Sequence, residues 1–224
     1  MKPDPNLVTS SRLLAQQDAL HTSELILDKA EELIALKGVF GFHLKDIAEP
    51  LGIRVQAIYK HFHNRDDVLI AVSRRFIDLL SQQFDLDMDL SLRPRIEQSL
   101  RAFVDFNIQH PAYVRLALID FATPEGGMEY VKLAAGGPFK DNFTSGPLSP
   151  MHKRLRRTLN EGARTGEFRR CDPLQFYRVV YSTTLMQLVF PEDSLLFPNR
   201  NARGVAKVKR NLIDVAMRYL NPGS

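Results

Sequence analysis

The apolar positions of this chain repeat mainly with the period of an α-helix. The first clear stripe shares one helical face and consists of Ile26, Ala30, Leu33 and Ile34. Thr22 or Ser23 is suited to cap the start of this helix, and Gly38 is suited to end it. Residues 1–21 carry weaker signals, so a flexible arm is expected there, either partly disordered or loosely helical.

Similar stripes continue to the end of the chain. Asn64, followed by two acidic residues, resembles a capped helix start. Further helices are expected over 64–84, 96–107, 111–121, 149–162, 172–190 and 201–220. Glycine and proline indicate a long loop over 122–148, with a short helix near 128–135, and a linker over 191–198. Since no strand-like alternation persists, the predicted fold is all-α with about nine helices.

Residues 42–62 contain the pattern that points to a function. Two short helices are expected there, joined at Leu51-Gly52-Ile53, where Gly52 allows a positive φ at a sharp turn. The side chains expected to face the core are Ile47, Ala48, Leu51, Ile58 and Phe62. This arrangement is a helix-turn-helix, whose second helix enters the major groove of DNA.

The same segment resembles the DNA-binding domain of the tetracycline-repressor (TetR) family of transcriptional regulators. The matching elements are Ile26–Leu36, Lys37-Gly38, Asp46-Ile47-Ala48, Leu51-Gly52-Ile53, Ile58-Tyr59, His61-Phe62 and Arg65–Leu69. The resemblance implies an arm (1–21), a helix-turn-helix domain (22–65) and a ligand-binding and dimerisation domain (66–224). It also implies a repressor that a small-molecule effector releases from operator DNA.

The chain departs from the family pattern at four positions. His43 stands where Ser or Thr usually caps the second helix, and Pro50 is expected in the last turn of that helix. Arg54 and Ala57 replace a frequent Ser and a frequent Thr. These departures motivate one alternative, a helical adaptor that has lost specific DNA binding. Another is a TetR-like activator or co-regulator.

Nine residues are the candidates for contact with a double-stranded DNA operator. Lys45, Lys60 and Arg65 can neutralise phosphates, and the Tyr59 hydroxyl can donate a hydrogen bond to one. Base contacts are expected from Arg54 to guanine, from Gln56 to adenine, and from Val55 or Ala57 to a thymine methyl group. A phosphate-facing His61 is a better interpretation of His61-Phe62-His63 than a metal site.

A second set of residues is expected to line an effector pocket, although the same stripes also suit a plain helical core. The aromatic candidates are Phe103, Tyr113, Phe121, Tyr177 and Tyr181. The polar candidates, as anchors for the ligand's polar end, are Asn107, His110, Arg115 and Arg178. Few fixed charges lie among these aromatic residues, so a mainly hydrophobic effector is predicted.

The two predicted C-terminal helices, 172–190 and 201–220, are too apolar to face solvent on all sides. They are expected to form a four-helix homodimer interface, two helices from each chain. A charge at Leu185 or Leu212 is therefore expected to give monomers.

Composition excludes several other classes of protein. Of the 224 residues, 44% are hydrophobic and 25% charged, which is typical of a folded globular chain. There is no apolar run of 18 residues, no secretory signal pattern and only one cysteine, Cys171, so a cytoplasmic protein without membrane contact is expected.

No motif of an enzyme, metal site or cofactor stands out in the sequence, so neither a catalytic role nor a cofactor is predicted. The net charge is only +4, but residues 149–224 hold 14 Lys and Arg against 6 Asp and Glu. That basic balance leaves room for an acidic group on an otherwise apolar ligand.

Overall fold

The computed structural model describes residues 5–83, 86–120, 143–189 and 202–223. Every regular element in these ranges is an α-helix, which confirms the all-α prediction. The nine helices of these ranges are α1 (Pro5–Lys37), α2 (Leu44–Ala48), α3 (Val55–Tyr59), α4 (Arg65–Gln83), α5 (Leu92–Gln109), α6 (Pro111–Asp120), α9 (Ser149–Thr165), α10 (Pro173–Val189) and α11 (Ala202–Leu220). Most of the predicted 122–148 loop, its short helix and the 191–198 linker fall outside the described residues.

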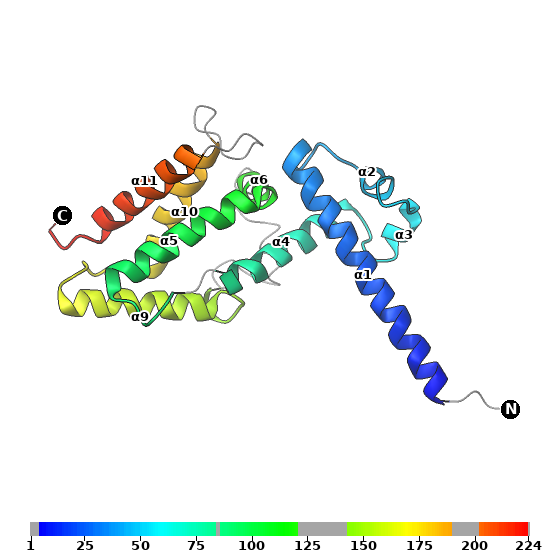
Figure 1. The fold of residues 1–224 in the computed structure, drawn as a ribbon, viewed down its shortest axis with the longest axis horizontal. Coiled ribbons are helices and arrows are strands. Elements are labelled where there is room, and N and C mark those ends of the chain that lie inside the picture. The colour runs from blue at the N-terminus through cyan, green and yellow to red at the C-terminus, as the bar shows by residue number, and fades with distance from the viewer. Residues whose placement is uncertain (1–4, 84–85, 121–142, 190–201, 224) are drawn as a thin grey trace.

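Helix α1 begins far earlier than its apolar stripe. The predicted cap at Thr22 is wrong, because the helix starts at Pro5 and Thr22 donates its hydroxyl to the Asp18 carbonyl oxygen (2.9 Å) within it. Thr can form this bond inside a helix as readily as it caps one. The helix projects away from the rest of the molecule toward its N-terminus (Figure 1). Among residues 18–37, whose burial the structure describes, the first fully buried side chain is Ile26.

Residues 26–72 form an N-terminal bundle around the buried stripe of α1. Helices α2 and α4 pack against α1, and α3 packs against α2. Gly38 ends α1 at φ +79°, and Gly52 takes φ +64° in the turn between α2 and α3, so both predicted glycine positions are confirmed. Ile47 and Ile58 are fully buried, whereas Leu51 is half-buried.

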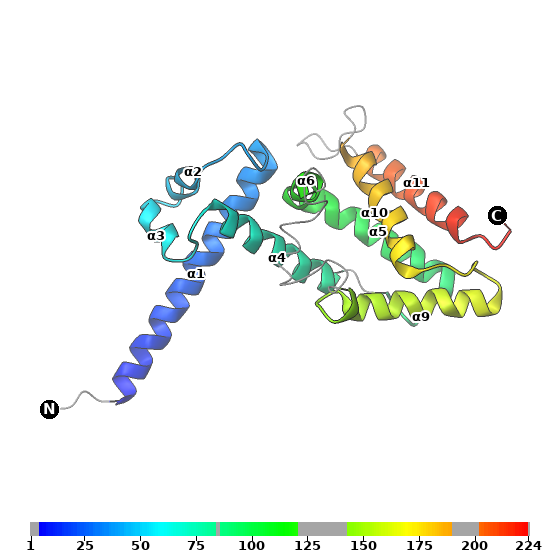
Figure 2. The ribbon, with the colours of Figure 1, turned by 180° about the vertical axis from the view of Figure 1, so that it is seen from behind.

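The C-terminal bundle consists of α5, α6, α9, α10 and α11. Helix α5 runs through it and contacts α4, α6, α9, α10 and α11 (Figures 1 and 2). Helix α4 leads from the N-terminal bundle into this part, and α6 packs back against α1 and α4. Helix α6 therefore touches both halves of the molecule.

The apolar positions of residues 201–220 predict a seam of Val205, Val208, Leu212, Val215 and Tyr219, but helix α11 is rotated relative to it. Its fully buried side chains repeat every four residues and are Val208, Leu212, Ala216 and Leu220. Val215 is instead 37% exposed. Leu185 of α10 is also buried, at 1% exposure. Leu185 and Leu212 thus belong to the core of one chain, and the expectation that a charge there separates two chains is wrong.

Candidate DNA-binding surface and effector core

The start of helix α2 is capped without a Ser or Thr. The backbone N–H of His43 donates to Oδ2 of Asp46 (2.6 Å), the residue three positions later, as in half of a capping box. This hydrogen bond lowers the pKa of Asp46, and the nearby Lys37 and Lys45 add to the effect. Pro50 lies beyond Ala48, where α2 ends, so its missing N–H breaks no hydrogen bond of the helix.

Helix α3 divides the predicted DNA contacts from the core. Ile58 is fully buried, and the C-terminal neighbour of the helix, Phe62, is 8% exposed. On the opposite face Gln56 and Lys60 are exposed, Tyr59 is exposed beside them, and Arg54 is exposed at the N-cap that precedes the helix. Val55, Ala57 and His61 are half-buried at its margin, and Lys45 is exposed on α2. Polar donors and small apolar groups therefore share one outer surface, as a major-groove reader requires.

Arg65 is the exception among the nine DNA candidates. Its Nη2 donates to the Val39 carbonyl oxygen, and its guanidinium lies 5.3 Å from the centre of the Phe42 ring. Arg65 thus fastens the start of α4 to the loop after α1. Contact of Arg65 with a phosphate stays a prediction.

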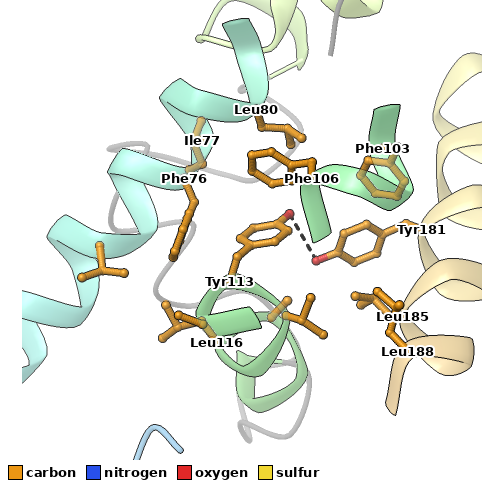
Figure 3. Close-up of a cluster of buried hydrophobic side chains, with 14 of the residues drawn as sticks. Phe76, Ile77, Leu80, Phe103, Phe106, Tyr113, Leu116, Tyr181, Leu185 and Leu188 are labelled. Atoms are coloured by element: carbon orange, nitrogen blue, oxygen red, sulfur yellow. Dashed lines mark hydrogen bonds between the residues drawn. The ribbon is translucent and has the colours of Figure 1, made fainter. Parts of the chain in front are cut away.

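Four of the predicted effector residues meet in one buried aromatic cluster. They are Phe103 of α5, Tyr113 of α6, and Tyr177 and Tyr181 of α10, all at most 7% exposed. The Tyr113 hydroxyl donates to the Tyr181 hydroxyl (3.4 Å), as Figure 3 shows. Tyr177 stacks on Tyr181 with ring centres 5.5 Å apart. Burial raises the pKa of Tyr177 well above 10.0, and the Tyr113 hydroxyl raises it further.

Asn107 and His110 lie beside this cluster. Asn107 is fully buried, donates from Nδ2 to the Phe103 carbonyl oxygen (2.8 Å), and leaves its buried Oδ1 without a hydrogen bond. His110 packs against Phe106, with ring centres 4.7 Å apart. Burial, and then the charge of Arg75, lowers the pKa of His110, so its neutral form is favoured.

The remaining effector candidates lie elsewhere. Arg115 donates from Nε to the Ala35 carbonyl oxygen (3.1 Å), so it joins α6 to α1 instead of facing the aromatic cluster. Arg178 is exposed on α10. Phe121 lies outside the described residues.

A small apolar crevice adjoins the aromatic cluster at Tyr177. Its lining comes from α5, α9, α10 and the segment before α5, and consists of Leu86, Ile96, Ser99, Leu100, Met151, Leu155, Phe176, Tyr177 and Val180. About 20 Å³ is left between these side chains, which is room for about one water molecule. Of the predicted effector residues only Tyr177 lines it. The missed residues lie on apolar stripes that the sequence shows but cannot distinguish from ordinary core.

Other possible sites receive no support from the described residues. Within these ranges no group of His, Cys, Asp and Glu is placed to hold a metal ion. Cys171 is half-buried, and this burial raises the pKa of its thiol, which opposes the reactive thiolate of a redox sensor. Among the described helices, none is both long enough and apolar enough to cross a lipid bilayer.

Comparison with known proteins agrees with the N-terminal geometry. Residues 26–72 match the bacterial regulatory proteins of the tetR family. Over 87 residues the chain is 34% identical to the uncharacterized HTH-type transcriptional regulator TtgW of Pseudomonas putida. That match covers 39% of this chain and 60% of the relative, so the chain spans less than two thirds of this curated protein.

Two solved structures share the fold over most of the chain. FadR of Bacillus subtilis, in complex with stearoyl-CoA, has a TM-score of 0.64 at 14% identity and covers 88% of this chain and 99% of its own. AibR, in complex with isovaleryl coenzyme A and operator DNA, has a TM-score of 0.59 at 16% identity. It covers 89% of this chain and 98% of its own. At these identities the likeness establishes the arrangement of helices.

Proposed function

We propose that this chain, whose residues 26–72 belong to the tetR family of bacterial regulatory proteins, is a transcriptional regulator that a hydrophobic effector releases from DNA. The observation that carries the proposal is the division of α3, with Ile58 fully buried and the opposite face exposed. That exposed face offers donors and acceptors for base edges, and basic side chains for phosphates. The protein is proposed to act in the cytoplasm and to have no enzymatic role.

The proposed DNA complex is a homodimer on a palindromic operator. Two copies of α3 then enter major grooves one helical turn apart, each reading one half-site. Arg54 and Gln56 supply bidentate hydrogen bonds to bases, while Tyr59 and Lys60 fix the register on the phosphates. The domain division at residues 22–65 and 66–224 is part of this proposal.

Helices α10 and α11 are the proposed dimer interface. Each leaves an apolar side chain outside the core of its own chain, Met186 at 45% and Val215 at 37% exposure. These two positions, unlike Leu185 and Leu212, can be changed without opening the core. Met186→Lys with Val215→Lys should give monomers of unchanged helicity, measured by sedimentation and circular dichroism. A dimer that survives both changes contradicts this interface.

Coupling between effector and operator is proposed to pass through α6. Tyr113 of this helix belongs to the aromatic cluster, and Arg115, two residues later, donates to the Ala35 carbonyl oxygen of α1. An effector that prefers one position of α6 therefore also prefers one position of α1, which packs against α2 of the helix-turn-helix. The activator alternative uses the same linkage with the opposite sign.

The two main reasons for the adaptor alternative, Pro50 and the absent Ser or Thr cap, give it little support. Pro50 lies outside α2, and the start of that helix has two hydrogen bonds without a Ser or Thr: the Asp46 carboxylate accepts the His43 N–H, and the His43 carbonyl oxygen accepts the Asp46 N–H. A fully formed helix-turn-helix with an exposed reading face favours specific DNA binding.

Selection from randomised DNA duplexes tests the function. The wild-type protein should enrich a palindrome, and Gln56→Ala should relax the preference at one base pair of each half-site. Gln98→Ala, at an equally exposed position on α5, is the matched control and should leave the selected sequence unchanged. Enrichment of no sequence by the wild-type protein contradicts the regulator and favours the adaptor.

A further inference from the structure

The outer face of α9 carries a cluster of positive charge. The exposed basic side chains of this helix are Lys153, Arg156, Arg157 and Arg164. They follow one another at intervals of three, one and seven residues and so share one side of the helix. Within the part of the chain that the structure describes, none of the four forms an ion pair or a side-chain hydrogen bond.

Like charges at this spacing repel one another and weaken a helix. The neighbouring His152 is affected as well, since burial and then the charge of Arg156 lower its pKa. Positive charge gathered on one face, with no acidic partner in the described part of the chain, complements an anion with several charges. Arg also matches phosphate oxygens with two parallel N–H donors.

The opposite face of the same helix lines the apolar crevice. Met151 and Leu155, one turn apart, face Leu100 and Ile96 of α5 and Val180 of α10 across it. Except for the Ser99 and Tyr177 hydroxyl groups, the lining side chains are hydrocarbon, aromatic or thioether. Such a lining suits an aliphatic chain, because any uncompensated polar group would lose its hydration there.

The C-terminal half of helix α9 is anchored by polar contacts and by close packing. The buried Arg95 of α5 donates from Nη1 to the Thr158 hydroxyl (3.1 Å) and pairs with Glu161 (3.7 Å). Gly162 is packed so closely on the Phe168 ring that a Cβ there would come within 2.1 Å of it. The crevice lies beside the N-terminal half, at Met151 and Leu155, so an acyl chain that enters it must displace these two side chains from those of α5 and α10.

We propose that the effector is an amphiphile with an aliphatic acyl chain and a polyanionic phosphate head group, of the acyl-coenzyme A class. The chain occupies the crevice between α5, α9 and α10, and the phosphates bind the basic face of α9. The inference rests on the proposed effector function and names the ligand class for it. Nucleic acid fits less well, because α9 lies away from α3 (Figures 1 and 2) and an apolar crevice offers nothing to a duplex.

Calorimetric titration of the full chain tests the inference with three probes: palmitoyl-coenzyme A, free coenzyme A and palmitate. The thioester should bind at least tenfold more tightly than either part alone. Arg156→Gln with Arg157→Gln should weaken thioester binding by about 5- to 30-fold, because two exposed ion pairs are lost, and should leave palmitate unaffected. Arg93→Gln with Arg101→Gln, two exposed arginines on α5, removes the same charge and should change nothing.

Leu155→Ala gives the crevice an independent readout. A wider crevice should shift the preferred acyl length upward in a series from four to eighteen carbons, without changing the affinity for free coenzyme A. Equal binding of palmitate and the thioester, or equal effects of the two arginine pairs, overturns the inference. The inference is also overturned if Arg156→Gln with Arg157→Gln weakens binding to a DNA duplex or to anionic vesicles but leaves thioester binding unchanged.

A separate measurement tests the proposed regulator function independently of the ligand class. Operator affinity, measured by fluorescence anisotropy on the selected palindrome, reports DNA binding without any effector. If the protein binds the thioester but selects no operator, the proposed ligand class stands and the proposed regulator function is contradicted. If the protein binds its operator but does not bind the thioester, only the proposed ligand class is contradicted.

Discussion

The outer face of α3 and the aromatic cluster of α5, α6 and α10 use similar side chains in opposite ways. Tyr59 on α3 is 52% exposed, and its hydroxyl group makes no hydrogen bond within the described residues. Tyr113 and Tyr181 are at most 6% exposed, and their hydroxyl groups meet each other (Figure 3). A surface that reads DNA must keep its donors ready for an external partner, whereas a core must satisfy them internally.

This difference separates binding from stability in the two regions. Loss of a side chain from the outer face of α3 removes its proposed contacts with DNA and opens no cavity in the protein. Loss of one from the aromatic cluster opens a cavity at once, whatever it also does to an effector. Changes on the α3 face should therefore alter DNA affinity, whereas changes in the aromatic cluster should alter the free energy of unfolding.

Phe103→Ala should have the largest effect. Phe103 is fully buried and its ring lies 6.2 Å from that of Tyr181 and 6.4 Å from that of Tyr177. Its truncation should lower the free energy of unfolding by about 3–5 kcal/mol, measured by urea denaturation. Phe40→Ala, at 70% exposure in the N-terminal bundle, is the control and should cost less than about 1 kcal/mol. Equal losses would show that the C-terminal cluster is not the main core.

Tyr59→Ala with Lys60→Ala should leave stability almost unchanged and weaken DNA binding. Both contacts are proposed to reach phosphates, so all sequences should lose affinity together, by about 10- to 100-fold. The slope of log K against log salt should become shallower by about 1, because one cation fewer neutralises a phosphate. Anisotropy titrations at several salt concentrations on specific and random duplexes measure both. A loss confined to one sequence would make Tyr59 or Lys60 a base reader.

The helical framework was predictable because each element carries its own signal. The apolar stripe from Ile26 to Ile34, the Asn64 start of α4 and the turn at Gly52 depend on nearby residues, and the structure has all three. Asn64 Oδ1 accepts the backbone N–H of Asp67 (2.8 Å), as a cap does. The early start of α1 was missed because Thr22 suits both a cap and the interior of a helix.

The site depends on packing between distant elements, and there the sequence was less informative. Phe103, Tyr113, Tyr177 and Tyr181 lie on predicted buried stripes and meet in the structure, and their contact with an effector stays a prediction. Arg115 and Arg178 lie apart from that cluster, because a polar residue next to apolar ones can equally contact another helix or solvent. The partner of Arg115, the Ala35 carbonyl oxygen, lies 80 residues away in the chain. No local pattern encodes that contact.

Arg115→Gln tests whether the two regions communicate through α6. The hydrogen bond to Ala35 is half-buried, so its loss should cost about 1 kcal/mol of stability. The informative readout is the effector-induced fall in operator affinity, which should shrink while affinity without effector changes less than about threefold. Arg101→Gln, on an exposed position of α5, is the control. An undiminished effector response would place the coupling in the contact between α4 and α5 instead.

Asp46→Asn should have the smallest effect, and its sign depends on pH. The pKa of Asp46 is lowered in the folded chain from 3.8, chiefly by the His43 N–H and further by Lys37 and Lys45. A lowered pKa means that the carboxylate stabilises the fold above about pH 4 and loses this contribution as the pH falls through the folded-state pKa. Asn at position 46 can still accept the hydrogen bond but carries no charge. The wild-type protein should therefore lose more stability than the variant between about pH 6 and pH 3.

The matched control for that charge is Asp66→Asn in the first turn of α4. Asp66 shares the favourable position near a helix N-terminus, but no hydrogen bond to its carboxylate is present among the described residues. Urea denaturation at a series of pH values should show the wild-type and Asp46→Asn curves converging as the solution becomes acidic. If Asp66→Asn converges equally, the helix dipole alone accounts for the effect. If neither converges, the His43–Asp46 bond does not hold the start of α2, the helix that precedes the DNA-reading face.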